Sequence, residues 1–240
     1  MKLVFLGTRG EIEARTRRHR RHSSLAVSYR RRELILDLGL DWLGRFERLA
    51  PRAIVLTHAH PDHAGGLREG APCAVHATRD TWSALRRYPI DDRREVAARE
   101  SFAIGAIRLE PFPLEHSLRA PAVGYRIEAG RKTVFYAPDV AAIVDEGDAL
   151  AGVDAYVGDG AAITRPIVRY RDEERIGHAS IREQLDWCAR AGVPRAIFTH
   201  CGSEIVKGHA RAVAKRVGEL GRERGVRAEI AHDGLELILR

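Results

Sequence analysis

The chain has 240 residues, of which 45% are hydrophobic and 30% are charged, and its formal net charge is +7. This is enough apolar material for one large core, so we expect a single domain over residues 1–240. No apolar stretch is long enough to cross a bilayer, and the start, MKLVFLGTRGE, makes a poor signal peptide. Three scattered cysteines exclude a disulfide framework. We therefore expect a cytoplasmic protein with no membrane partner.

Strand-like segments alternate with helical ones along the chain. Apolar patterns predict strands at residues 2–6, 24–29, 33–38, 53–57, 73–78, 107–114, 122–129, 132–137, 154–159, 195–200, 227–232 and 235–239. Helical patterns cover residues 40–50, 78–87, 180–191 and 208–221, and the third begins with a capping box of Ser180 and Glu183. Strands this numerous, with helices between them, predict two sheets with helices outside.

Arginine supplies most of the positive charge, since only four of the 40 basic residues are lysines. A basic protein favours acidic partners, including phosphates, but an arginine bias alone is weak evidence for nucleic acid. The densest basic run is RTRRHRRHSS, and its stretch 15–22 is either a phosphate contact or a solvated loop. We favour the loop.

The stretch LTHAHPDHAGG places His58, His60, Asp62 and His63 directly after the strand at 53–57. In an extended segment His58 and His60 point the same way, and Pro61 then turns the backbone so that the next two side chains approach from another angle. Imidazoles and carboxylates are good ligands for zinc and similar divalent ions. Because a loop of surface histidines does not explain this density, we predict a metal site.

The stretch THAHPDHAGG resembles the metal-binding signature of the metallo-β-lactamase superfamily. The resemblance extends along the chain through FLGTRG, LILDLG, PLEHS, YAPDV and FTHCG, in the family's order. It implies an α/β fold, a four-layer αβ/βα sandwich, with a site for two divalent ions. Zinc is the first expectation, and manganese and iron are the alternatives.

The resemblance also implies a ligand set. One ion would be held by His58, His60 and His116, and the second by Asp62, His63 and His200. Asp139 would bridge both ions, and Asp37 would support a ligand histidine by a hydrogen bond. A metal-bound hydroxide would be the nucleophile, oriented by Asp62.

A second histidine pair bears on the reaction. His178 precedes the capped helix and His200 follows the next strand, an arrangement similar to RNase Z and its phosphodiesterase relatives. In that branch the earlier histidine contacts the scissile phosphate or assists the leaving group. Asp159 stands where the family has the acidic partner of that histidine, so we expect an Asp159–His178 pair. The alternative is that His178 only packs near the helix.

Two departures concern the substrate. Asp139 follows His116 by only 23 positions, which leaves no room for the long tRNA-gripping arm of many RNase Z enzymes. APD also replaces the usual Gly-Asp-Thr around the bridging aspartate. This compact form is more similar to small-molecule phosphodiesterases such as the cyclic-phosphate hydrolase of phosphonate breakdown.

The basic segment between Gly160 and Gly177 lies directly before His178. It is either a lid, whose Arg165, Arg169 or Arg171 binds phosphate, or a solvated loop.

We therefore expect a dinuclear metal-dependent hydrolase, a phosphodiesterase acting on a small or cyclic phosphodiester or an RNA end. The alternatives are a thioester hydrolase of the glyoxalase II kind and a non-catalytic, metal-containing nucleic-acid-binding module. A homodimer is a further possibility for the partner. The other histidines, which fall outside the ligand pattern, are expected at the surface or in packing: His19, His22, His76, His209 and His232.

Overall fold

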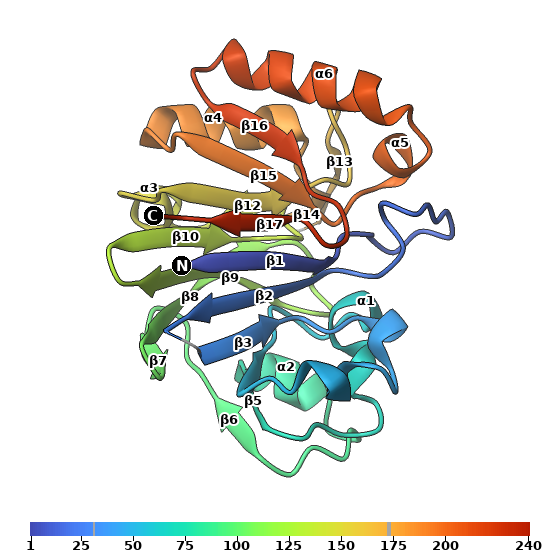
Figure 1. The fold of residues 1–240 in the computed structure, drawn as a ribbon, viewed down its shortest axis with the longest axis vertical. Coiled ribbons are helices and arrows are strands. Elements are labelled where there is room, and N and C mark those ends of the chain that lie inside the picture. Colours follow the sequence, from blue (N-terminus) through green and yellow to red (C-terminus); the bar gives the residue numbers. More distant parts are fainter. Residues whose placement is uncertain (31, 172–173) are drawn as a thin grey trace.

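The computed structural model describes residues 1–30, 32–171 and 174–240. Two mixed β-sheets face each other, and Figure 1 shows helices on their outer sides. The first sheet has the order β17-β1-β2-β3-β4-β5-β6. Its strands are Lys2–Gly7 (β1), Ser24–Tyr29 (β2), Arg32–Leu36 (β3), Ala53–Val55 (β4), Ala74–Ala77 (β5), Arg93–Glu95 (β6) and Glu236–Ile238 (β17).

The second sheet has the order β11-β8-β9-β10-β12-β15-β16, with β7 paired to β8. Its strands are Phe102–Ile104 (β7), Ile107–Glu115 (β8), Ala122–Ala129 (β9), Lys132–Tyr136 (β10), Ala142–Ile143 (β11), Ala155–Asp159 (β12), Arg195–Thr199 (β15) and Arg227–Ile230 (β16). The α-helices are Pro61–Ala64 (α1), Arg79–Ala84 (α2), Glu146–Leu150 (α3), Ile181–Ala191 (α4), Ser203–Val206 (α5) and Ala210–Arg222 (α6), and Gly65–Leu67 (η3) is a 3₁₀ turn.

Three hydrophobic cores separate the four layers. The central core joins the two sheets, with Phe5 and Leu36 of the first packed against the cluster of Tyr125 and Val157 from the second. One outer core covers the second sheet with α4 and α6, and the other covers the first sheet with α2 and its neighbouring turns. Apolar burial of this extent is the main favourable term in folding. The predicted αβ/βα sandwich is therefore confirmed.

Local signals in the sequence account for α4. Ser180 accepts a hydrogen bond from the Glu183 backbone N–H, and Glu183 in turn accepts one from the Ser180 backbone N–H, so the predicted capping box is present. The helix ends at Gly192, whose φ of 69° is a left-handed conformation that glycine adopts without strain. Ile181 and Leu185 lie in the outer core. The helix is thus fixed in place over the strand ends of the second sheet.

Two sequence-based expectations are corrected. Residues 40–50 form two short 3₁₀ turns, Leu40–Trp42 (η1) and Phe46–Leu49 (η2), in place of one helix. Gly44 lies between them with a φ of 64°, which is incompatible with a continuing helix. The segment 160–177 is not a loop over its whole length, and its role as a lid stays a prediction. It contains most of a β-hairpin, Ile167–Arg171 (β13) paired with Glu174–His178 (β14); residues 172–173 lie outside the described part.

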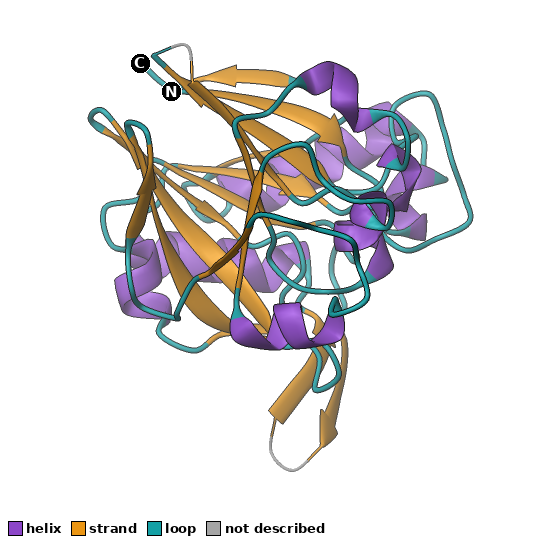
Figure 2. Ribbon diagram, turned by 90° about the horizontal axis from the view of Figure 1, so that it is seen from below, coloured by secondary structure: helices purple, strands orange, loops and turns teal. Residues whose placement is uncertain are grey.

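The hairpin extends away from the sandwich, as the two-stranded ribbon at the lower edge of Figure 2 shows. Within the described residues, no helix combines the length and the apolar character that crossing a membrane requires. The carboxyl ends of β4, β10, β12 and β15 precede or carry the polar residues singled out above. These strand ends build the site.

Candidate metal centre

The loop after β4 supplies four of the predicted ligands from six consecutive positions. His60 is the N-cap of α1 in an extended conformation, and Pro61 occupies the first helical position, which its fixed φ suits. Asp62 and His63 follow in the first turn. The ring centroid of His58 lies 4.6 Å from that of His60 and 4.2 Å from that of His63. The turn at Pro61 thus brings the side chains of this loop together around one point.

Asp37 supports this loop from a fully buried position. Its carboxylate accepts hydrogen bonds from the Thr57 backbone N–H at 2.8 Å and from Nδ1 of His63 at 2.9 Å. The Thr57 hydroxyl also donates to Asp37, and can then accept from Nδ1–H of His58 at 3.0 Å. In both histidines Nε2 is thereby left facing the cluster. Asp37 itself has a φ of 59°, a conformation that aspartate tolerates better than most residues.

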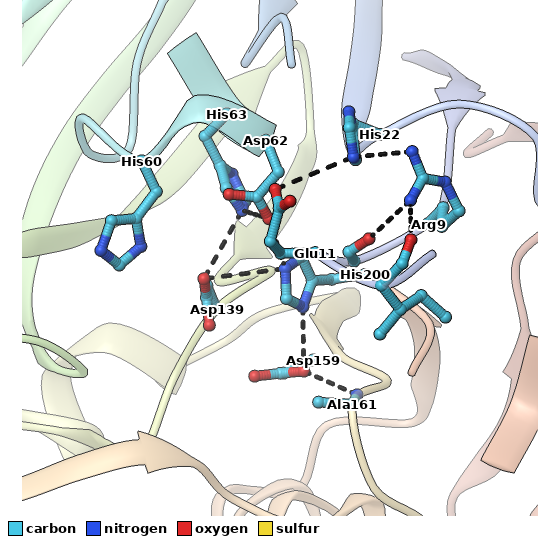
Figure 3. Close-up of polar contacts among 12 residues, drawn as sticks. Arg9, Glu11, His22, His60, Asp62, His63, Asp139, Asp159, Ala161 and His200 are labelled. Carbon is cyan, nitrogen blue, oxygen red and sulfur yellow. Dashed lines mark hydrogen bonds and ion pairs between the residues drawn. The ribbon is translucent and has the colours of Figure 1, made fainter. Parts of the chain in front are cut away.

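The remaining predicted ligands arrive from the second sheet. His116 follows β8, and its Nδ1 lies 3.0 Å from the Gly177 carbonyl oxygen, which accepts a hydrogen bond from Nδ1–H. Asp139 follows β10, and His200 follows β15 with a φ of 50°. Nε2 of His200 lies 3.0 Å from Oδ2 of Asp62. Figure 3 shows Asp139 between His63 and His200, the two sheets meeting at this point.

These side chains fall into groups whose potential ligand atoms all lie within 4.8 Å of one another. One group is His58, His60, His116 and Asp139, and another is Asp62, His63, Asp139 and His200. Asp139 belongs to both. The grouping has the partition that the sequence resemblance implies; the assignment of each residue as a ligand remains a prediction.

The donor set fits divalent ions. Nε2 of His63 is buried and has no hydrogen-bond partner within the described chain, and carboxylate oxygens of Asp62 and Asp139 each lie 3.5 Å from it. A buried nitrogen left without a partner costs free energy unless something occupies the space that it faces. A cation coordinated by imidazole and carboxylate satisfies all three groups.

The pKa values divide the predicted ligand histidines into two kinds. Burial lowers the pKa of His58 well below its ordinary value, so its ring is neutral and has a free lone pair. Burial raises the pKa of Asp62, but His63 and His200 outweigh it and hold that pKa well below the ordinary value. Burial also lowers the pKa of His63 and His200, but nearby carboxylates outweigh it, raising the pKa of His63 well above its ordinary value and that of His200 to about 9. Metal binding at these two rings therefore displaces a proton from each, because an imidazole coordinates metal in its neutral form.

A third group adjoins the other two and contains Asp139, Asp159, His178 and His200. Nδ1 of His178 lies 2.8 Å from Oδ2 of Asp159, the partner expected from the sequence, and 2.8 Å from Oδ1 of Asp139. The Asp159 carboxylate is held by backbone N–H groups of Val140 at 3.1 Å and of Ala161 at 2.8 Å.

Sequence reasoning missed a buried residue that supports this pair. The Gln184 side chain, from α4, accepts from the Asp159 backbone N–H and donates to its carbonyl oxygen, both at 2.8 Å. Gln184 occupies the buried face of a capped helix, and a polar residue on that face was the available signal. The capped helix therefore fixes the position of Asp159 as well as the core.

A cavity of about 660 Å³ opens over the centre. It is lined by predicted ligands, by His178 and by Arg165. Arg169 lines a neighbouring cavity, and Arg171 is found in the lining of neither. Glu11, which the sequence analysis did not single out, also lines the first cavity, and Figure 3 shows it beside Asp62.

The comparisons with known proteins agree with the fold. A family model described as a β-lactamase superfamily domain matches residues 32–201. Coenzyme PQQ synthesis protein B of Methylobacterium sp. (strain 4-46) is 30% identical over 225 residues, with 78% of this chain and 73% of the relative covered. Ribonuclease Z of Mycolicibacterium paratuberculosis is 26% identical over 206 residues, which cover 68% of this chain and 73% of the relative.

Two crystal structures share the architecture. The metallo-β-lactamase fold protein YhfI from Bacillus subtilis aligns with a TM-score of 0.77 at 14% identity, covering 98% of each chain. A diphosphatase from the PhnP family aligns with a TM-score of 0.73 at 17% identity, covering 100% of this chain and 98% of its own. The chain has the metallo-β-lactamase fold and belongs to the β-lactamase superfamily, a superfamily of hydrolases that use divalent metal ions.

Proposed function

We propose that the protein is a dinuclear metal-dependent phosphodiesterase acting on a small or cyclic phosphodiester or on an RNA end. The observation that carries the proposal is the His178–Asp159 pair beside the two ligand groups. Relatives named ribonuclease Z and a structural neighbour described as a diphosphatase support phosphorus chemistry. Zinc is the first candidate for the metal, with manganese or iron as alternatives.

His178 is suited to a phosphoryl substrate because it holds a positive charge. Burial lowers the pKa of His178, but the carboxylates of Asp159 and Asp139 outweigh this effect and raise it to about 11. Asp159 belongs to neither of the two predicted ion sites, so its carboxylate still favours the protonated ring when metal is bound. Since Nδ1 faces these carboxylates, Nε2–H is the group left to bind a phosphoryl oxygen or to protonate a departing alkoxide.

Asp62 acts on the attacking water. Divalent ions held by the two ligand groups would supply Lewis acidity for the phosphoryl group and would lower the pKa of water. Asp62, whose carboxylate is ionised, orients the attacking water and accepts its hydrogen bond. The cavity of about 660 Å³ has room for a small diester or the end of an RNA strand.

The test is turnover by purified protein reconstituted with Zn²⁺ or Mn²⁺. We expect hydrolysis of bis(p-nitrophenyl) phosphate to exceed hydrolysis of S-lactoylglutathione, the substrate expected of a glyoxalase II-like thioesterase. The reverse preference would favour the thioester alternative. No turnover with any divalent ion at full metal occupancy, together with tight RNA binding, would favour the non-catalytic module.

A second candidate rests on the relatives named coenzyme PQQ synthesis protein B, one of which is 30% identical to this chain. On this reading the same centre serves a metal-dependent step in making that coenzyme. The test is complementation: this chain is expressed in a Methylobacterium strain that lacks its own copy of that protein. Restored coenzyme PQQ, measured by mass spectrometry, would support the second candidate.

A further inference from the structure

The metal centre lies between two cavities. The first, of about 660 Å³, contains Glu11, Arg165 and most of the predicted ligands in its lining. The second, of about 520 Å³, lies against the β13–β14 hairpin and is lined by Arg119 and Arg169. We call the second cavity the arginine lobe. Residues common to both linings are His60, His116, Ile167 and His178. A substrate reacting at the centre therefore has space on both sides of its scissile bond.

The two cavities differ in charge. Four carboxylates line the first, from Glu11, Asp62, Asp139 and Glu204, against one arginine, Arg165. The arginine lobe has two arginines in its lining, and no carboxylate among the residues that the structure describes. Even with metal ions bound to Asp62 and Asp139, Glu11 and Glu204 remain on the first side. Apart from the predicted ligands, the first side thus carries charges of both signs, whereas the arginine lobe has guanidinium groups without a carboxylate in its described lining.

Both arginines of the lobe are free to bind a ligand. Arg119 and Arg169 are exposed, and neither guanidinium group forms an ion pair or hydrogen bond with another residue of the described chain. By contrast, Glu204 in the first cavity is already paired with Arg216 at 3.0 Å. Guanidinium groups bind phosphate oxygens in a bidentate manner, and two of them suit a dianion.

The wall of the arginine lobe is apolar on the hairpin side. Ile167, Val168 and Ile176 contribute to it, and Ile167 is 58% exposed. An apolar wall beside two cations fits an organic ring that carries an anionic group, and fits an isolated inorganic ion less well.

We propose that the arginine lobe binds a second phosphate group of the substrate, carried on the ester arm that lies against the hairpin. The inference rests on the proposed phosphodiesterase function and narrows its substrate class to diesters whose arm bears a further phosphate. Arg119 and Arg169 bind that phosphate, and the reacting diester lies at the metal centre. A substrate with an unphosphorylated arm loses these contacts.

A matched pair of chromogenic diesters tests the proposal. Thymidine 5′-(p-nitrophenyl phosphate) and its 3′-phosphorylated form release the same p-nitrophenol. We expect kcat/KM to be about tenfold higher for the phosphorylated form, since two charge-assisted pairs at a partly exposed site are gained. The R119Q/R169Q double variant should remove this preference. Arg211→Gln, an exposed change on α6 away from both cavities, should keep it.

A binding experiment separates this inference from the proposed function. Calorimetry should show thymidine 3′,5′-bisphosphate binding about tenfold more tightly than thymidine 5′-monophosphate, with the difference lost in R119Q/R169Q. If neither diester is hydrolysed but this difference is present, the lobe stands and the phosphodiesterase proposal fails. If the diesters are hydrolysed at equal rates, or the double variant keeps the preference, the lobe proposal is wrong.

Discussion

The two sheets contribute to the metal centre in different ways. The first sheet gives four candidate ligands from one loop, residues 58–63, held by Asp37 beneath it. The second sheet gives its side chains singly, from strand ends between residues 116 and 200 that the chain brings together only on folding. The first half is therefore organised locally, and the second depends on long-range packing. The comparison teaches that a recognisable motif is only half of this centre.

The largest effect is expected at Asp139, where the two halves meet. Asp139→Asn keeps the shape but removes the charge that both ligand groups share. We expect activity to fall to background and metal affinity to fall more than about 100-fold, since losing a supporting residue alone costs 10–100-fold. Equilibrium dialysis with elemental analysis measures this. Asp91→Asn, at an exposed carboxylate, is the control; equal metal content in both variants would contradict the shared role.

The next largest effect is expected at His178, among the side chains that the second sheet contributes. His178→Gln should lower kcat on phosphodiesters by about 100-fold or more, because it removes a positioned proton donor. Metal content should stay unchanged. His178 also lies in the third group of potential ligands. The metal content of the variant therefore distinguishes a proton donor from a metal ligand. A parallel loss of metal would make His178 a ligand and would weaken the proposed proton-donor role.

A smaller effect is expected for Asp37, which supports the ligand loop of the first sheet. Asp37→Asn preserves a residue that tolerates the left-handed backbone but turns an N–H group toward Nδ1–H of His63. We expect metal affinity to fall about 10–100-fold and the free energy of unfolding to fall by about 1–3 kcal/mol. Urea unfolding and metal titration measure the two. Asp154→Asn, which removes a carboxylate bonded to Thr133 and Lys132 elsewhere, should lower stability without changing metal affinity.

The smallest effect concerns a histidine outside the centre. Burial, with Arg18 and His232, lowers the pKa of His19 to about 4. Its Nδ1 lies 2.9 Å from the Thr8 hydroxyl, which donates to Asp233. The folded pKa lies below the unfolded one, so stability is complete above about pH 6.5 and is lost as the pH falls toward 4.

His19→Gln should reduce that loss. The slope of unfolding free energy between pH 6.5 and 4 should become shallower by at most about 1.4 kcal/mol per pH unit. Thermal and urea unfolding across this range provide the measurement. An unchanged slope would show that His19 is protonated equally in the folded and unfolded states, and would remove it from the set of buried neutral histidines.

Local sequence determined much of this fold. Apolar periodicity placed the strands from 122 to 136 and from 195 to 199, and the capping box placed α4, because these signals act over a few neighbouring residues. Local pattern failed at residues 40–50, where apolar spacing indicated a helix and Gly44 interrupts it. It also failed for the hairpin, whose strands β13 and β14 pair with each other and extend away from the two sheets.

For the site, the sequence by itself determined the loop of residues 58–63 and the chemistry of its side chains, because four metal-binding groups in six positions are close in any compact conformation. Only the tertiary structure decided that Asp139 adjoins both ligand groups, that Gln184 fixes Asp159, and that Arg119 faces the cavity beside the hairpin. These relations join residues far apart in the chain. They exist only once the two sheets pack and the parallel strands bring their carboxyl ends to one edge.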